Sequence, residues 1–180
     1  MPRLHNAFFG LLLVGFAGCA TAPKSGPDRA RLETSASDTV SRMVAEDPSL
    51  QTTLDNAAGY AVFPTVGKGA LIIGGASGRG VLFDHGKAVG FVRLDEASLG
   101  LQAGGETFSE LIVLRTPSAL QNMKNDNFHL AAKMSAVALT TGAAAGAEFR
   151  DGVAVFIMPK GGAMVDVSVG GQQIRFTGRG

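Results

Sequence analysis

The stretch that decides the fold is GALIIGGASGRGVLFDHGKAVGFVRL, residues 69–94. Short apolar runs within it are interrupted by glycines and by the polar tetrapeptide DHGK at residues 84–87. Two apolar runs joined by a short polar turn that contains glycine are typical of a β-hairpin. We therefore expect strands at 80–84 and 87–94 joined by a tight turn, with another strand at 69–77.

The regions on both sides of this hairpin predict more strands. A run at 60–63 should end at Pro64, because proline cannot donate a hydrogen bond to a sheet. Residues 98–106 alternate between apolar and small or polar side chains, and 109–116 form another apolar run. The three apolar segments near the C-terminus favour an antiparallel meander of consecutive strands; they are 152–158, 163–169 and 172–176.

Helical patterns come mainly before the strands. Asp28 is suited to cap a helix over 28–46, in which apolar residues recur every four positions, and Pro48 suits the first turn of a second helix. Residues 117–125 predict a third, short helix that begins with proline. For the Ala-rich segment 130–147 we expect a buried strand or helix rather than a membrane-inserting segment, because Lys133 is costly in hydrocarbon.

This order of elements predicts the α+β class, with N-terminal helices packed on a curved, glycine-rich antiparallel β-sheet that is sandwich-like or barrel-like. The sequence has 25 glycines among 180 residues. Glycine weakens a strand unless the sheet bends or another group packs closely against the backbone. Close packing or curvature explains the strand glycines best, and a smooth concave surface for a lipid chain is the alternative; they are Gly74, Gly75, Gly90, Gly100 and Gly104.

The N-terminus predicts export. Residues 1–18 combine Arg3 with a short apolar core, which is typical of a secretory signal peptide. The segment before Cys19, the sole cysteine, resembles the bacterial lipobox, in which the cysteine is acylated; a plain signal peptide with an incidental cysteine is the alternative. Residues 19–27 then read as a flexible tether to one domain over 28–180. Ala20 favours the outer membrane over other sites, by resemblance to Gram-negative lipoproteins, with the domain facing the periplasm.

Charge argues against nucleic-acid binding. Removal of residues 1–18 leaves 15 basic and 15 acidic side chains, whereas nucleic-acid-binding domains usually have a basic excess. We therefore expect no nucleic-acid partner.

The glycine-rich stretch matches no catalytic template. A P-loop needs two glycines separated by four residues and then Lys and Ser or Thr, but Gly80 and Gly86 are separated by five, and Ala88 follows the lysine. A nucleophile elbow needs glycine where Arg79 stands. We expect no enzyme activity, no cofactor and no metal site. A hydrolase that uses Ser77 and His85 is retained as a minor hypothesis, and it requires these two side chains to lie within hydrogen-bond reach.

Three ordered motifs resemble the SYLF domain family. They are AAGYAVFPTVGKGALIIGGASGRGVL at 57–82, SLGLQAGGE at 98–106 and KGGAMVDVSVGGQQI at 160–174. Together they extend over residues 49–176, which is nearly all of the predicted domain. Several motifs at matching intervals are more specific than one glycine cluster.

The resemblance implies a lipid-binding module without known catalysis. Eukaryotic members are described as binding phosphoinositides and a fungal branch as binding actin, so we expect an anionic phospholipid headgroup as the ligand here. Lys68, Arg79 and Lys160 lie beside glycine-rich turns and are the candidate headgroup-binding residues. The alternative is a structural or partner-binding envelope lipoprotein, with an actin-binding-like module and an envelope protein as its partner.

Overall fold

The computed structural model describes residues 25–70, 73–99, 104–125, 128–130, 134, 136–161 and 171–179. The predicted signal peptide 1–18, Cys19 and most of the predicted tether lie outside these residues, as does the predicted strand at 163–169. The predictions for these segments therefore remain predictions.

Two helices open the described chain. Helix α1 covers Gly26–Glu46 and α2 covers Ser49–Asp55. Ser25 caps α1, since its hydroxyl oxygen accepts a hydrogen bond from the backbone N–H of Asp28 at 3.3 Å. The prediction of Asp28 as the cap was wrong: Ser25 supplies the acceptor, and Pro27 suits the first turn because it needs no N–H partner there.

Strands and one further helix follow. Among the described residues, eight strands form one sheet with the order β5-β8-β3-β2-β1-β4-β7-β6. All pairings are antiparallel except β6 with β7, which is parallel. The elements are β1 Gly59–Ala70, β2 Ile73–Asp84, β3 Lys87–Leu99, β4 Gly104–Leu114, α3 Pro117–Lys124, β5 Phe128–His129, β6 Val137–Ala138, β7 Val153–Gly161 and β8 Gln172–Gly178.

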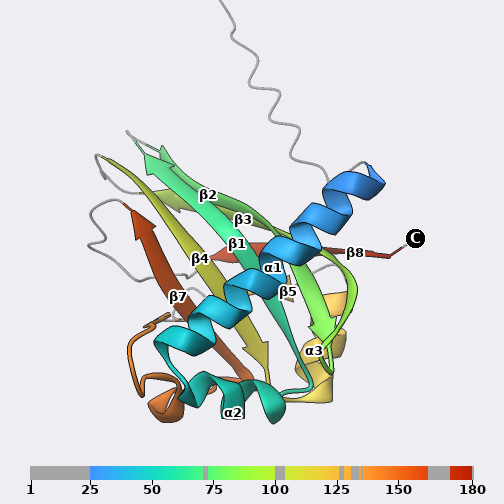
Figure 1. The fold of residues 1–180 in the computed structure, drawn as a ribbon. Coiled ribbons are helices and arrows are strands. Elements are labelled where there is room, and N and C mark those ends of the chain that lie inside the picture. The colour runs from blue at the N-terminus through green and yellow to red at the C-terminus, as the bar shows by residue number, and fades with distance from the viewer. Residues whose placement is uncertain are drawn as a thin grey trace, which may run out of the picture.

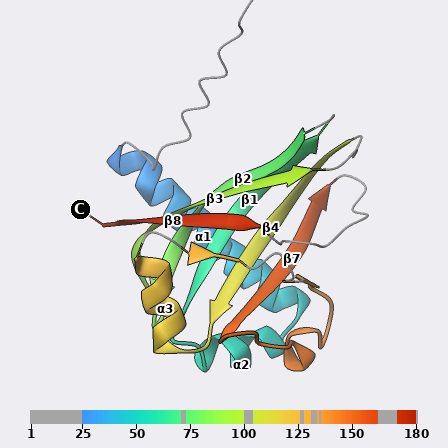
Figure 2. The same cartoon turned by 180° about the vertical axis from the view of Figure 1, so that it is seen from behind.

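The sheet curls into a half-barrel, and each of its faces packs against different elements. Helices α1 and α2 lie on the outer face (Figure 1). On the inner face, β8 passes across the other strands, with α3 and β5 beside it (Figure 2). Phe63, Ile112 and Ile174 are buried on the inner face, while Phe83 and Phe156 are buried on the face that α1 covers. The predicted fold class, helices on a curved and mainly antiparallel sheet, is confirmed.

The predicted hairpin is present between β2 and β3. His85 and Gly86 have φ angles of 46° and 77°, as a two-residue turn with both central residues in the left-handed region requires. Close packing accounts for Gly90 in β3, because a Cβ added there would collide with the Phe176 ring and with the carbonyl oxygen of Thr177, 2.5 Å away. At this position the packing explanation for strand glycines holds.

Strand β1 does not end at Pro64, contrary to the prediction. It continues to Ala70 through an irregularity between Val62 and Thr65, where the register shifts. Pro64 sits within this irregularity, where a strand tolerates a missing N–H, and its carbonyl oxygen accepts a hydrogen bond from the Ser109 hydroxyl at 2.8 Å.

The C-terminal half was predicted as a meander and as one buried element over 130–147. The meander stays a prediction, because its middle strand at 163–169 lies outside the described residues; within them, β7 pairs with β4 and β6, and β8 pairs with β3 and β5. The described part of 130–147 holds the two-residue β6 and a 3₁₀ turn over Ala144–Gly146 rather than one long element. Several of its apolar side chains are nevertheless buried, Leu130 and Leu139 among them, so burial was predicted better than regular structure.

Candidate functional site

The curled sheet separates the three predicted headgroup residues. Lys68 points to the inner face, where its side chain is 10% exposed and its Nζ lies 3.6 Å from Glu96 Oε1. Arg79 and Lys160 lie on the outer face and are exposed. Lys68 therefore has an internal partner, and only the other two lie on a surface that a membrane can reach.

Arg79 and Lys160 belong to a larger group of cations on the outer face. Arg79 of β2 lies directly opposite Arg93 of β3, and Arg93 lies opposite Arg175 of β8. Side chains alternate along a strand, so Arg79 and Arg93 share the side of Val81 and Phe91, and Arg175 lies on the side opposite to the inward-facing Ile174. All three therefore lie on the outer side of the curled sheet, although Figure 2 shows β8 in front of the sheet and α1 behind it. Together with Arg42 of α1, these residues make up what we call the basic face: Arg42, Arg79, Arg93, Lys160 and Arg175.

Lys160 joins the basic face through β1. Its Nζ donates a hydrogen bond to Thr65 Oγ1 at 3.0 Å, and Thr65 is the register partner of Arg79. Partial burial, and then the charge of Arg42, lower the pKa of Lys160. The charge of Arg42 thus acts on Lys160, although α1 and β7 are far apart in the sequence.

Sequence reasoning missed Arg42, Arg93 and Arg175. The predicted strand at 87–94 contained Arg93, and side-chain alternation would have placed it on the same face as Phe91. The pairing of β3 with β8 had no local signal, because 76 to 88 residues separate their paired positions. The sequence alone therefore did not predict that Arg79, Arg93 and Arg175 lie side by side.

A second polar cluster is buried on the inner face. It comprises Lys68 of β1, Glu96 of β3, Glu110 of β4 and Gln172 of β8. The Gln172 Nε2 donates to Glu96 Oε2 at 3.2 Å and to Glu110 Oε2 at 3.1 Å, while Glu110 Oε1 and Gln172 Oε1 have no hydrogen-bond partner among the described residues. Four strands thus meet at one charged cluster inside the half-barrel.

The pKa of Glu110 is strongly shifted by its place in this cluster. Its burial raises the pKa to about 8, the hydrogen bond from Gln172 opposes this shift, and the neighbouring charge of Glu96 adds to it. Near neutral pH, Glu110 is therefore largely protonated.

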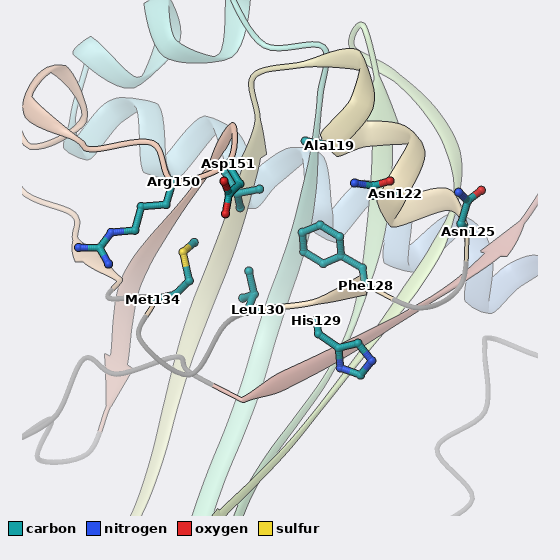
Figure 3. A pocket seen from close by; sticks show the side chains of 10 residues that line it. Ala119, Asn122, Asn125, Phe128, His129, Leu130, Met134, Arg150 and Asp151 are labelled. Atoms are coloured by element: carbon teal, nitrogen blue, oxygen red, sulfur yellow. The ribbon is translucent and has the colours of Figure 1, made fainter.

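A pocket of about 420 Å³ lies between α3, β5 and the start of β7 (Figure 3). Phe128, Leu130 and Met134 form its apolar floor, and polar side chains such as His129 and Arg150 stand at its rim. An apolar floor below a polar rim suits a small amphiphilic group. None of the predicted headgroup residues lines this pocket.

The hydrolase hypothesis is wrong. Ser77 and His85 are separated by eight residues, nearly all within the extended strand β2, which places their backbones on the order of 25 Å apart. His85 instead lies beside Asp84, with its Nδ1 at 2.6 Å from the Asp84 carboxylate.

In the described part of the chain, no group of three or more His, Cys, Asp or Glu side chains is placed to hold a metal ion. None of the helices in the described ranges has both the length and the apolar character needed to cross a membrane.

Comparison with known proteins gives one family. Residues 95–178 match the family model described as "Ysc84: Las17-binding protein actin regulator". The matched segment contains the end of β3 and the elements from β4 to β8, and therefore Glu96, Glu110, Lys160, Gln172 and Arg175. The search of curated proteins found no match.

Proposed function

Because residues 95–178 belong to the SYLF (Ysc84) family, we propose that this protein is a non-enzymatic module that binds anionic phospholipid surfaces. The basic face is the observation that supports this function. Five cations from one helix and four strands lie on the outer side of the curled sheet, and Asp95 neutralises one of them. A cation close to an anionic membrane contributes about 1 kcal/mol.

Vesicle flotation tests this proposal. The test protein is the chain from residue 19 with Cys19→Ser, which has no acyl chains. It should float with phosphatidylglycerol vesicles and remain in solution with uncharged phosphatidylcholine vesicles. Flotation with neither kind of vesicle would exclude lipid binding by the domain.

We further propose that acyl chains on Cys19 hold the protein at the outer membrane with its domain in the periplasm. Each buried methylene contributes about 0.8 kcal/mol, so that two or more chains give stable anchoring without help from the domain. A tethered domain meets the membrane at high local concentration, so weak headgroup binding by the basic face is sufficient.

Expression in a Gram-negative cell tests the anchor. The wild-type chain should incorporate a palmitate analogue and sediment with outer membranes, whereas Cys19→Ser should be unlabelled and soluble in the periplasm. An unlabelled, soluble wild-type chain would instead support the plain signal peptide.

The family's description as a Las17-binding actin regulator favours a second candidate, a module whose partner is a protein. An acidic protein surface is complementary to the basic face in the same way as a membrane. In-cell crosslinking from position 79 distinguishes the two: one specific protein adduct favours the second candidate, and adducts with phospholipid favour the first.

A further inference from the structure

The three arginines of the basic face lie in one line across neighbouring strands. Arg79 is paired with Arg93 in β2 and β3, and Arg93 is paired with Arg175 in β3 and β8. Like charges directly opposite each other destabilise a sheet. An anion bound across the line would remove this cost, whereas the fold by itself gains nothing from it.

The members of this line differ in how they are paired. Arg93 donates two hydrogen bonds to the Asp95 carboxylate, at 2.7 and 2.6 Å, so its guanidinium group is already neutralised. Arg79 is exposed and makes no hydrogen bond or ion pair with the residues that the structure describes. Arg175 is exposed and donates one hydrogen bond, at 3.3 Å, to Gln173. The line thus has two guanidinium groups that can bind a ligand, those of Arg79 and Arg175. Between them lies the guanidinium group of Arg93, which is already paired.

The distance between Arg79 and Arg175 follows from the geometry of the sheet. Neighbouring strands lie about 4.8 Å apart, so the backbones of Arg79 and Arg175, two strands apart, are separated by about 10 Å. A guanidinium group can bind one phosphate through two parallel hydrogen bonds, which an ammonium cannot do. Two such groups at this separation match two phosphates better than one.

Small side chains leave room beside the line. Ser77, two residues before Arg79 on the same face of β2, is exposed and pairs with Gly67 of β1. Gly67 faces open space, since a Cβ added there would meet no atom within 4 Å. A headgroup can therefore lie flat on the sheet next to Arg79 without meeting a bulky side chain.

We propose that Arg79 and Arg175 bind the two phosphates of one lipid, so that the basic face prefers headgroups with two phosphate groups over headgroups with one. This inference rests on the proposed lipid-binding function and adds a ligand class to it. Arg42 and Lys160 contribute attraction to any anionic surface, whereas Arg79 and Arg175 provide the selectivity.

The test compares two kinds of vesicle with equal surface charge. One contains phosphatidylglycerol, with a single phosphodiester, and the other contains half as much cardiolipin, with two. The chain from residue 19 with Cys19→Ser should bind the cardiolipin vesicles about fivefold more tightly, because the second phosphate binds within the same molecule. Equal dissociation constants would overturn the inference and leave the proposed function intact. Absence of binding to both would overturn the proposed function and this inference with it.

Arginine-to-lysine variants separate geometry from charge. The double variant Arg79→Lys/Arg175→Lys keeps both positive charges but loses the guanidinium groups that can form two parallel hydrogen bonds to one phosphate. The ratio of the two dissociation constants should therefore fall to about one. The matched variant Arg31→Lys/Arg115→Lys, whose residues belong neither to the basic face nor to the pocket, should keep the wild-type ratio. A ratio that persists in the first variant would contradict the assignment to Arg79 and Arg175. Thermal unfolding confirms that each variant is folded.

Discussion

At the scale of single residues, Glu110 is the most informative side chain in the core. It is completely buried in β4, and it lies close to a second carboxylate, Glu96, through their shared partner Gln172. Lys68 compensates one negative charge but not two. The folded protein therefore keeps a proton on Glu110 at pH values where the unfolded chain has released it.

This proton predicts how stability depends on pH. The unfolded chain releases it near the ordinary value of 4.5, and the folded chain releases it near 8. Between these values the folded state binds more protons, so the free energy of unfolding falls as pH rises, by up to about 1.4 kcal/mol per pH unit. Glu110→Gln should lack this fall and should be more stable than the wild type at pH 8, as measured by urea unfolding.

The relevant quantity is the difference in unfolding free energy between Glu110→Gln and the wild type, because other titrating groups contribute equally to both proteins. Glu148→Gln, a change in an exposed carboxylate, is the matched control and should follow the wild-type profile. Parallel profiles for Glu110→Gln and the wild type would show that Glu110 is ionised in the folded protein.

At the scale of elements, the corner between α1 and α2 is held by one buried acid. Asp47 accepts four hydrogen bonds: from the Ser49 N–H and hydroxyl at 3.0 and 2.7 Å, from the Gly142 N–H at 3.0 Å and from the Ala144 N–H at 2.7 Å. Burial would raise the pKa of Asp47, but these hydrogen bonds together hold it below its usual value. One carboxylate thus joins two helices to a loop about 95 residues away.

Replacing this acid should loosen the corner. Asp47→Asn puts an N–H₂ group where the carboxylate accepts hydrogen bonds, which leaves a buried donor without a partner and costs about 3 kcal/mol of unfolding free energy. Asp55→Asn, a change in an exposed side chain of α2, should cost less than about 0.5 kcal/mol. Because the pKa of Asp47 is lowered by folding, its contribution is present above pH of about 4 and is lost as pH falls below it. Equal losses for the two variants would contradict this role.

The elements also show what the sequence could predict. The β2–β3 hairpin and α3 follow from local chemistry: a two-residue turn at His85 and Gly86, and a proline at the start of the helix after Thr116, whose hydroxyl accepts from the Ala119 N–H. Pro64 was misread because a strand irregularity accommodates it, and no local pattern marks an irregularity.

The candidate site was less predictable than the fold. Lys68, Arg79 and Lys160 look alike in the sequence, each beside glycines, but the curl of the sheet buries the first and exposes the other two. The partners that turn Arg79 into part of a line come from β3 and β8, and the β8 pairing depends on the topology of the complete sheet. Local reasoning found single cations, and the arrangement of strands made them one surface.

At the scale of the whole molecule, the half-barrel separates two kinds of charge. The inner face holds a compensated, buried cluster that serves the fold, whereas cations gather on the outer side of the sheet. An overall charge near zero hides this division, because composition sums over both faces. We place the membrane at the outer side of the sheet.

The binding constant for phosphatidylglycerol vesicles, measured for charge-reversal variants at low and high salt, tests this claim most directly. Arg79→Glu/Arg175→Glu should weaken binding more than 30-fold at 10 mM salt, since each lost cation near the membrane accounts for about 1 kcal/mol and each new acid is repelled. The loss should shrink at 150 mM salt, where the screening length falls to about 8 Å. Lys87→Glu/Arg115→Glu, the same change of charge at the other end of the strands, should weaken binding far less. Equal losses for the two variants would show that net charge, and not the basic face, governs binding.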